Sequence, residues 1–234
     1  MAKTVPETPS SPFRALAADY DGTLAEGGTV SATTLDALRR LKSSGRRLLL
    51  VTGRQLDDLQ SVFPDLDLCD LVVAENGAVL FEPPGGPTTT LAPPPPLNVV
   101  EEMKRRGVSL STGLCVIATV RAHAQVVREV IAESRLDLEP IFNKDALMIL
   151  PRGVDKRSGL LAALPRLHLS PDQVVAVGDG ENDLPFLQAC GCSVAVANAV
   201  PALREAAALV TAGARGEGVR ELVDRLLSAA PAPS

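Results

Sequence analysis

The sequence predicts an α/β protein whose core is a parallel β-sheet covered on both faces by helices. Three observations lead to this class. Short apolar runs alternate with segments of helical spacing, the apolar runs contain no alternating polar residues, and each run ends at polar residues and glycine. Strands that are apolar on both sides lie in sheets that are buried on both faces, and strand–helix–strand order is typical of parallel sheets.

Residues 13–82 form the first part of this predicted core. Ser31 is suited to cap the first helix, Gly45 stands where a left-handed residue would end it, and Pro64 ends the second helix. In order, we expect a strand at 15–20, a helix between 31 and 45, a strand at 48–51, a helix at about 55–63 and a strand at 71–74.

The alternation breaks over residues 83–151, where we expect a small inserted α+β cap domain. Proline-rich segments at 83–87 and 93–96 are typical of linkers. Inside the insert we expect a helix at 98–106, an extended segment at 108–120, a helix at 122–134, and two short strands, one around 141 and one at 147–150.

The parallel pattern resumes over residues 152–234, which complete the core. Pro165 should end or kink the first helix of this part. We expect a helix from 156 to about 164, a strand at 174–177, a loop at 178–183, a helix at 184–189, a strand at 193–196 and a final helix near 219–228.

The composition bounds the partners and the compartment. Lys and Arg number 23 against 28 Asp and Glu, a net charge of −5 that argues against nucleic acid and anionic membranes as partners. No apolar run is long enough to span a bilayer. Residues 1–12 lack a signal-peptide stretch, so we expect a disordered N-terminal tail on a cytoplasmic protein. The four cysteines have neither metal-ligand nor disulfide spacing, which favours free thiols.

Polar residues follow four of the predicted strands and should meet at one crevice. Ligands of open parallel sheets bind outside the carboxyl ends of the strands. The polar segments are Asp19–Thr23, Thr52–Arg54, Lys156 at the start of the helix after the insert, and Gly178–Asp183. Each segment alone has an ordinary explanation as a turn, a helix cap or a surface lysine, but their joint position after buried strands favours a functional site.

Asp19, Asp21, Asp179 and Asp183 would bring four acids together in that crevice. Such a cluster is costly unless a cation lies among the carboxylates, and oxygen ligands of this kind favour Mg²⁺. A metal faced by a lysine, a threonine hydroxyl and glycine amides suits a phosphoryl group. Asp19 could then attack phosphorus and form an aspartyl-phosphate, while Asp21 would exchange protons with the leaving oxygen and with water.

At these residues the chain resembles the haloacid dehalogenase superfamily of phosphatases. Its four motifs are similar, in order, to Asp19–Leu24, Leu50–Arg54, Gly153–Lys156 and Gly178–Asp183, and the resemblance extends from about residue 13 to 227. It implies a Rossmann-like parallel core. Because the insert lies between the second and third motifs, the resemblance also implies a type IIB cap, which is found in the branch of sugar-phosphate and phosphoglycolate phosphatases.

The resemblance implies specific roles. Asp19 would be the nucleophile, Asp21 the general acid and base, and Thr52 and Lys156 would hold the phosphoryl group. Mg²⁺ would be bound by the carboxylate of Asp19, the backbone carbonyl of Asp21 and by Asp179, with Asp183 binding directly or through water. Substrate contacts are expected at Thr52, Gly53, Arg54, Lys156 and Asn182, and polar cap residues that could read the substrate are Arg121, His123, Asn143 and Lys144.

The function predicted from the sequence is therefore a Mg²⁺-dependent phosphatase acting on a small phosphorylated metabolite, either a sugar phosphate or a compound like phosphoglycolate. Two alternatives remain at this point. One is a phosphomutase of the same superfamily, which would use the same aspartates for intramolecular transfer. The other is a non-catalytic module that binds a phosphorylated ligand. The oligomeric state is not predicted.

Overall fold

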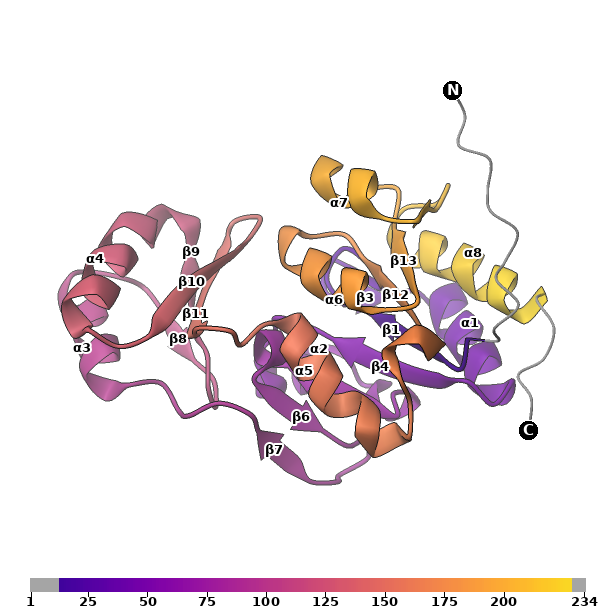
Figure 1. The fold of residues 1–234 in the computed structure, drawn as a ribbon, viewed down its shortest axis with the longest axis horizontal. Helices are drawn as coiled ribbons and strands as arrows, with labels where there is room; N and C mark the ends of the chain where they lie inside the picture. Colours follow the sequence, from indigo (N-terminus) through magenta and orange to yellow (C-terminus); the bar gives the residue numbers. More distant parts are fainter. Residues whose placement is uncertain (1–12, 229–234) are drawn as a thin grey trace.

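The computed structural model describes residues 13–228 and has two parts, a large core and a smaller cap (Figure 1). The core is built on an eight-stranded sheet and the cap on a four-stranded sheet. This arrangement confirms the predicted class, an α/β core with an inserted α+β module. The expected N-terminal tail, residues 1–12, lies outside the described residues. Among the described helices, none has the length and apolar character needed to cross a membrane.

The core sheet has the strand order β14-β13-β12-β1-β4-β5-β6-β7. Its first six strands are parallel, and β6 and β7 are antiparallel additions at one edge. Every residue of β1, β5 and β12 is buried, as expected for strands that are covered on both faces. The strands are β14 (Leu209–Val210), β13 (Cys192–Ala195), β12 (Val174–Gly178), β1 (Ala15–Ala18), β4 (Arg47–Val51), β5 (Leu71–Ala74), β6 (Val79–Phe81) and β7 (Thr88–Thr90).

Within residues 13–228, six α-helices lie around this sheet, and α1 packs on α8 while α5 packs on α6. Ser31 caps α1 as predicted, because its hydroxyl accepts the N–H of Thr34 at 3.2 Å, and Gly45 follows the helix with φ 83°. The helices are α1 (Ala32–Ser43), α2 (Leu56–Val62), α5 (Lys156–Ala163), α6 (Leu184–Ala189), α7 (Pro201–Ala206) and α8 (Arg215–Ser228). A small hairpin of β2 (Ala25–Glu26) and β3 (Thr29–Val30) follows β1.

The cap has the order helix, two strands, helix, two strands. Its antiparallel sheet, β10-β11-β9-β8, packs with two helices around a separate apolar cluster. The expected extended segment at 108–120 forms two short strands joined by a loop at 113–116. The elements are α3 (Leu97–Arg105), β8 (Ser111–Thr112), β9 (Ile117–Val120), α4 (Ala124–Ser134), β10 (Leu138–Asn143) and β11 (Ala146–Pro151).

The core sheet extends further along the chain than we expected. Residues 83–90 were assigned to the insert, but Thr88–Thr90 pairs with β6 as the edge strand β7. The proline- and glycine-rich segment 83–87 forms the turn before this strand, with the amide of Gly86 donating to the carbonyl of Glu82 at 2.8 Å. A cluster of proline and glycine is equally compatible with a turn and a linker, and only the strand pairing distinguishes them.

Candidate active site

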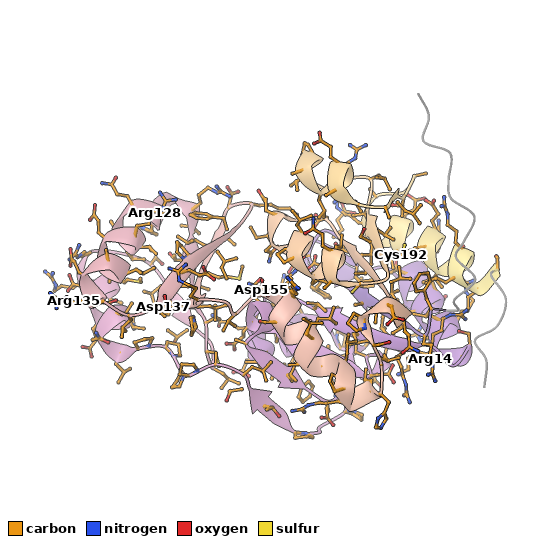
Figure 2. The ribbon with its side chains drawn as sticks, viewed as in Figure 1. Arg14, Arg128, Arg135, Asp137, Asp155 and Cys192 are labelled. Carbon is orange, nitrogen blue, oxygen red and sulfur yellow. The ribbon has the colours of Figure 1, made fainter. Side chains whose placement is uncertain are left out.

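The carboxyl ends of the parallel strands carry the predicted polar side chains to one edge of the core sheet. Asp19 follows β1, Thr52 follows β4 and Asp179 follows β12, and each of these side chains is buried. Lys156 begins α5 at the junction of core and cap, next to Asp155, which Figure 2 labels there. The edge of the sheet that faces the cap is therefore the candidate site, and the predicted polar side chains meet there.

Lys156 lies between two carboxylates at the centre of this site. Its ammonium donates to Asp19 Oδ1 at 2.5 Å and to Asp183 Oδ1 at 2.6 Å. Asp155 caps α5 through a reciprocal pair of bonds with Ser158, which fixes the first turn of the helix and aims Lys156 inward. Burial alone would lower the pKa of Lys156, but the neighbouring charges of Asp183 and Asp19 outweigh it and raise the pKa above its ordinary range.

Asp19, Asp179 and Asp183 form a cluster that fits a divalent cation. One oxygen from each carboxylate lies within 4.8 Å of the others, and all three residues are buried. Asp179 Oδ1 is buried without a hydrogen-bond partner in the described part of the chain, which leaves it available to a metal. Burial and the charge of Asp183 raise the pKa of Asp19 from 3.8 to about 7. A cation would relieve this cost, since opposite charge favours the ionised carboxylate.

Of the four acids that the strand ends were expected to bring together, Asp21 keeps its side chain outside the cluster, and only its backbone carbonyl was expected to bind metal. The guanidinium of Arg54 holds the Asp21 carboxylate through two bonds, Nε to Oδ2 at 2.6 Å and Nη2 to Oδ1 at 2.8 Å. Arg54 also donates to Asp58 at 2.6 Å, so its charge is shared between two acids. The expected contact of Arg54 with the substrate stays a prediction, and in this structure its donors bind Asp21 and Asp58. The three remaining acids still form the predicted cluster.

The other predicted site residues line the same edge. Thr52 Oγ1 accepts the backbone N–H of Arg54 at 3.1 Å. Asn182 donates to Asn76 Oδ1 at 2.8 Å, and its own Oδ1 is buried without a partner in the described residues. A Cβ atom at Gly53 would lie 3.0 Å from the sulfur of Met148 in β11, so the cap touches the core at this point.

Three of the four cap residues singled out from the sequence approach the site. Lys144 Nζ forms an ion pair with Asp179 Oδ2 at 2.6 Å, and Arg121 Nη2 lies 4.0 Å from Glu181 Oε1. A Cβ atom at Gly180 would lie 2.4 Å from Asn143 Oδ1. His123 makes no side-chain hydrogen bond or ion pair with the core among residues 13–228. The cap hairpin β10–β11 therefore covers the metal-binding edge directly.

Two residues whose hydrogen bonds connect the loops of the site were not predicted from the sequence. Glu75, which follows β5, is buried and accepts the N–H groups of Leu114, Cys115 and Val116 at 2.9, 2.7 and 3.0 Å. It thus pins a cap loop to the core. Asn198 donates to the carbonyl of Gly22 at 2.9 Å and to Asp179 Oδ2 at 3.2 Å, so it joins two of the site's loops.

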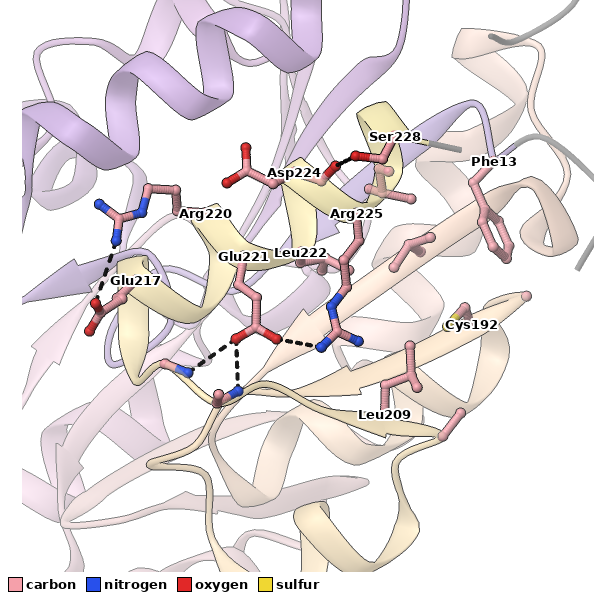
Figure 3. Close-up of a pocket in the computed structure, with 16 residues that line it drawn as sticks. Phe13, Cys192, Leu209, Glu217, Arg220, Glu221, Leu222, Asp224, Arg225 and Ser228 are labelled. Carbon is pink, nitrogen blue, oxygen red and sulfur yellow. Dashed lines mark hydrogen bonds and ion pairs between the residues drawn. The ribbon is translucent and has the colours of Figure 1, made fainter. Parts of the chain in front are cut away.

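A second hollow lies away from these residues. This groove of about 1050 Å³ is lined by α8 and by the strand edge at Cys192 and Leu209 (Figure 3). Its lining includes Phe13 and Leu222 but none of the predicted site residues. The charged side chains of this groove lie on α8 and include the ion pairs Arg220–Glu217 and Arg225–Glu221. The buried acids and the buried lysine at the strand ends are better suited to phosphoryl chemistry, so they define the candidate active site.

We expect Mg²⁺ to stabilise the protein more at pH 8 than at pH 5. Without metal, the raised pKa of Asp19 means that the folded state keeps a proton that the unfolded chain has lost, so stability falls as pH rises from about 4 to about 7. A bound cation removes this cost. Thermal denaturation with EDTA or excess Mg²⁺ at both pH values measures the difference. Asp179→Asn should abolish the metal effect, and an equal Mg²⁺ effect at both pH values would contradict the prediction.

Comparison with known proteins agrees with this geometry. The family model for haloacid dehalogenase-like hydrolases matches residues 16–89 and 140–223. A phosphoglycolate phosphatase of Methanothermobacter thermautotrophicus is 34% identical over 92% of this chain and 99% of its own length. Phosphoglycolate phosphatase 1 of Saccharolobus solfataricus is 32% identical over 89% and 93% of the two chains.

Solved structures share the whole fold. A haloacid dehalogenase-like hydrolase from Bacteroides thetaiotaomicron has a TM-score of 0.80 at 19% identity, covering 92% of this chain and 99% of that one. A sugar phosphatase of HAD subclass IIB has a TM-score of 0.73 at 18% identity, covering 91% and 98%. This chain belongs to the haloacid dehalogenase-like hydrolase family. Within it, the chain lies in the phosphatase branch, whose members are phosphoric monoester hydrolases.

Proposed function

We propose that this protein hydrolyses the phosphate ester of a small metabolite, with Mg²⁺ as its metal and Asp19 as its nucleophile. The observation that carries the proposal is the position of Asp19, whose carboxylate is held by Lys156 beside Asp179 and Asp183 under the cap. The relatives named phosphoglycolate phosphatase support a small anionic substrate, and phosphoglycolate is our first candidate.

The proposed reaction has two displacements. Asp19 attacks phosphorus and forms an aspartyl-phosphate as the bond to the ester oxygen breaks, and Asp21 gives that oxygen a proton. Asp21 then accepts a proton from the water that attacks phosphorus, which releases phosphate and restores Asp19. Lys156 and the hydroxyl of Thr52 hold the phosphoryl oxygens throughout. Mg²⁺, held by Asp19, Asp179 and Asp183, would offset the negative charge of these oxygens.

The contacts of Asp21 suit this proposed role. A group that exchanges protons with the leaving oxygen and with water must stand near the nucleophile without being consumed as a metal ligand. Arg54 holds the Asp21 carboxylate outside the acidic cluster through its two bonds, and the Asp21 oxygen that carries the transferred proton must release its bond from Arg54. The side chain of Asp21 is 43% exposed, which gives water access to it.

Phosphate release tests this function. We expect release from phosphoglycolate or from a sugar phosphate in the presence of Mg²⁺, and none once EDTA removes the metal. A generic aryl phosphate serves as a substrate without features for the cap to recognise. Isomerised sugar phosphate in place of free phosphate, after priming with a sugar bisphosphate, would favour a phosphomutase. If folded protein releases phosphate from none of the esters, the result would contradict hydrolysis and favour a ligand-binding module.

A further inference from the structure

The tip of the cap hairpin lies against the metal-binding edge of the core. β10 and β11 pair up to Asn143 and Ala146, so Lys144 and Asp145 form the two-residue turn between them. In Figure 1 this hairpin extends from the cap toward the core loop that precedes α6. The backbone N–H of Lys144 donates to Glu181 Oε2 in that loop at 3.1 Å. The turn therefore belongs to the wall of the site.

Arg121 fixes the direction in which this turn points. Its Nε donates to the carbonyl of Lys144 at 2.6 Å, and its backbone N–H donates to the carbonyl of Asp145 at 2.7 Å. The guanidinium stacks over the ring of Phe142 at 4.8 Å. Lys144 itself has φ 52°, a left-handed conformation that a lysine adopts only where its surroundings impose it. The backbone position from which the Lys144 side chain extends is thus fixed by the cap itself.

The ammonium of Lys144 reaches the centre of the site. It lies 2.6 Å from Asp179 Oδ2, and a Cβ atom placed on Gly22, in the loop after β1, would lie 2.9 Å from Nζ. An ammonium has three N–H donors, and Asp179 is the acceptor that the described residues give it. The side chain is 47% exposed. Lys144 therefore has donors left for a ligand beside the nucleophile's loop.

A metal ion and Lys144 can use Asp179 together. Lys144 and Asn198 occupy Oδ2, whereas Oδ1 is buried with no partner in the described part of the chain. A cation bound through Oδ1 leaves the Lys144 pair in place. The ammonium then stands next to the phosphoryl site, on the side covered by the cap, where the rest of a substrate must lie.

We propose that Lys144 is the specificity-determining residue of the cap, and that it binds the carboxylate that distinguishes phosphoglycolate from a sugar phosphate. This proposal rests on the proposed hydrolase function and names the residue that recognises its substrate. A carboxylate brings an opposite charge to its hydrogen bond with the ammonium of Lys144, whereas a neutral sugar hydroxyl accepts the bond without that charge. Because Lys144 contacts Asp179 itself, the carboxylate must lie within a few bonds of phosphorus, which favours two- and three-carbon acids over hexoses.

Lys144→Met tests the proposal through the ratio of two substrates. We expect kcat/KM for phosphoglycolate to fall about 10- to 100-fold, mostly through KM, because a charged hydrogen bond is lost. With ethyl phosphate, which lacks the carboxylate, the loss should be smaller by about 10-fold, because this substrate senses only the lost ion pair of Lys144 with Asp179. Lys144→Arg should recover part of the loss. Lys104→Met, an exposed lysine of α3 in the same cap, is the matched control and should alter neither substrate.

A binding measurement keeps this test independent of turnover. Calorimetry with 3-phosphonopropionate and with propylphosphonate, in the presence of Mg²⁺, compares ligands that differ in the carboxylate and cannot be hydrolysed. We expect Lys144→Met to weaken only the carboxylated ligand. Equal losses for both ligands, or for both esters, would overturn the proposal and assign Lys144 to the phosphoryl group or to cap closure. Absence of phosphate release by wild type would instead contradict the hydrolase function, while the phosphonate comparison still decides the role of Lys144.

Discussion

Asp19→Asn is expected to lower kcat/KM for phosphate release by at least about 10⁴-fold, which is the scale of losing a nucleophile that acts as part of a catalytic unit. The amide keeps the shape of the side chain, but it cannot attack phosphorus to form an acyl phosphate. Substrate binding should change far less, since Thr52 and Lys156 remain. Initial rates at saturating Mg²⁺ measure the effect, and release at a wild-type rate would exclude Asp19 as the nucleophile.

The same variant separates loss of chemistry from loss of folding. At pH 8 the ionised Asp19 is a cost to the metal-free fold, because its folded pKa of about 7 lies above its unfolded value of 3.8. A neutral amide removes that cost, although it also loses the ion pair with Lys156. We therefore expect Asp19→Asn with EDTA to be at least as stable as wild type at pH 8. Asp67→Asn, an exposed acid on a surface turn, is the control for the substitution itself.

The sequence predicted the acidic site because chain topology alone brings its members together. Asp19 and Asp179 each follow a buried strand, and adjacent parallel strands β1 and β12 end at the same edge of the sheet. Lys156 begins the helix that returns from the cap, so its place was equally fixed by element order. The position of each of these residues depends on which strand it follows, and the strands are recognisable in the sequence as apolar runs.

The contacts between core and cap could not be predicted in this way. Glu75 and the loop at 114–116 meet across a long stretch of sequence, and an acid after a strand is ordinarily solvated. Lys144 was one of four polar cap residues of equal standing in the sequence. Its ion pair with Asp179 depends on how the hairpin tip docks on the core, which neither residue pattern nor spacing expresses. The way the cap docks on the core is set by tertiary packing, and no periodic pattern in the sequence reports it.

The pairing of Asp21 with Arg54 shows a related limit. Asp21 stands two residues after Asp19 and was expected in the same cluster. A turn at Gly22, with φ 84°, lies between the end of β1 and the hairpin that follows. The direction of a side chain within such a turn depends on its partners, and here Arg54 supplies two donors. The sequence placed Asp21 in the correct loop, but it could not show that Arg54 is the partner of its carboxylate.

Lys156→Met should destabilise the metal-free protein by about 3 to 5 kcal/mol at pH 8, because it leaves two buried carboxylates without their shared cation. Asp19 and Asp183 would then repel each other in a site that excludes water. The loss should be smaller at pH 5, where Asp19 can take up a proton and the repulsion disappears. Chemical denaturation with EDTA at the two pH values measures both figures. Turnover should also fall, by about 100-fold or more, since the ammonium balances charge on the phosphoryl oxygens.

The double variant Lys156→Met with Asp19→Asn tells whether the lost pairing is the cause. If the orphaned carboxylate of Asp19 produces the instability, neutralising it should restore a large part of the stability at pH 8, and the two substitutions should be strongly non-additive. If the apolar stem of Lys156 is what matters, methionine already replaces most of its volume and the single variant should be nearly as stable as wild type. A double variant less stable than Lys156→Met alone would show that Asp19 supports the fold by contacts other than this ion pair.

Adding Mg²⁺ to Lys156→Met provides an independent comparison, because a divalent ion among Asp19, Asp179 and Asp183 supplies the missing positive charge. If the lost charge causes the instability, Mg²⁺ should recover stability at pH 8, as the Asp19→Asn substitution should.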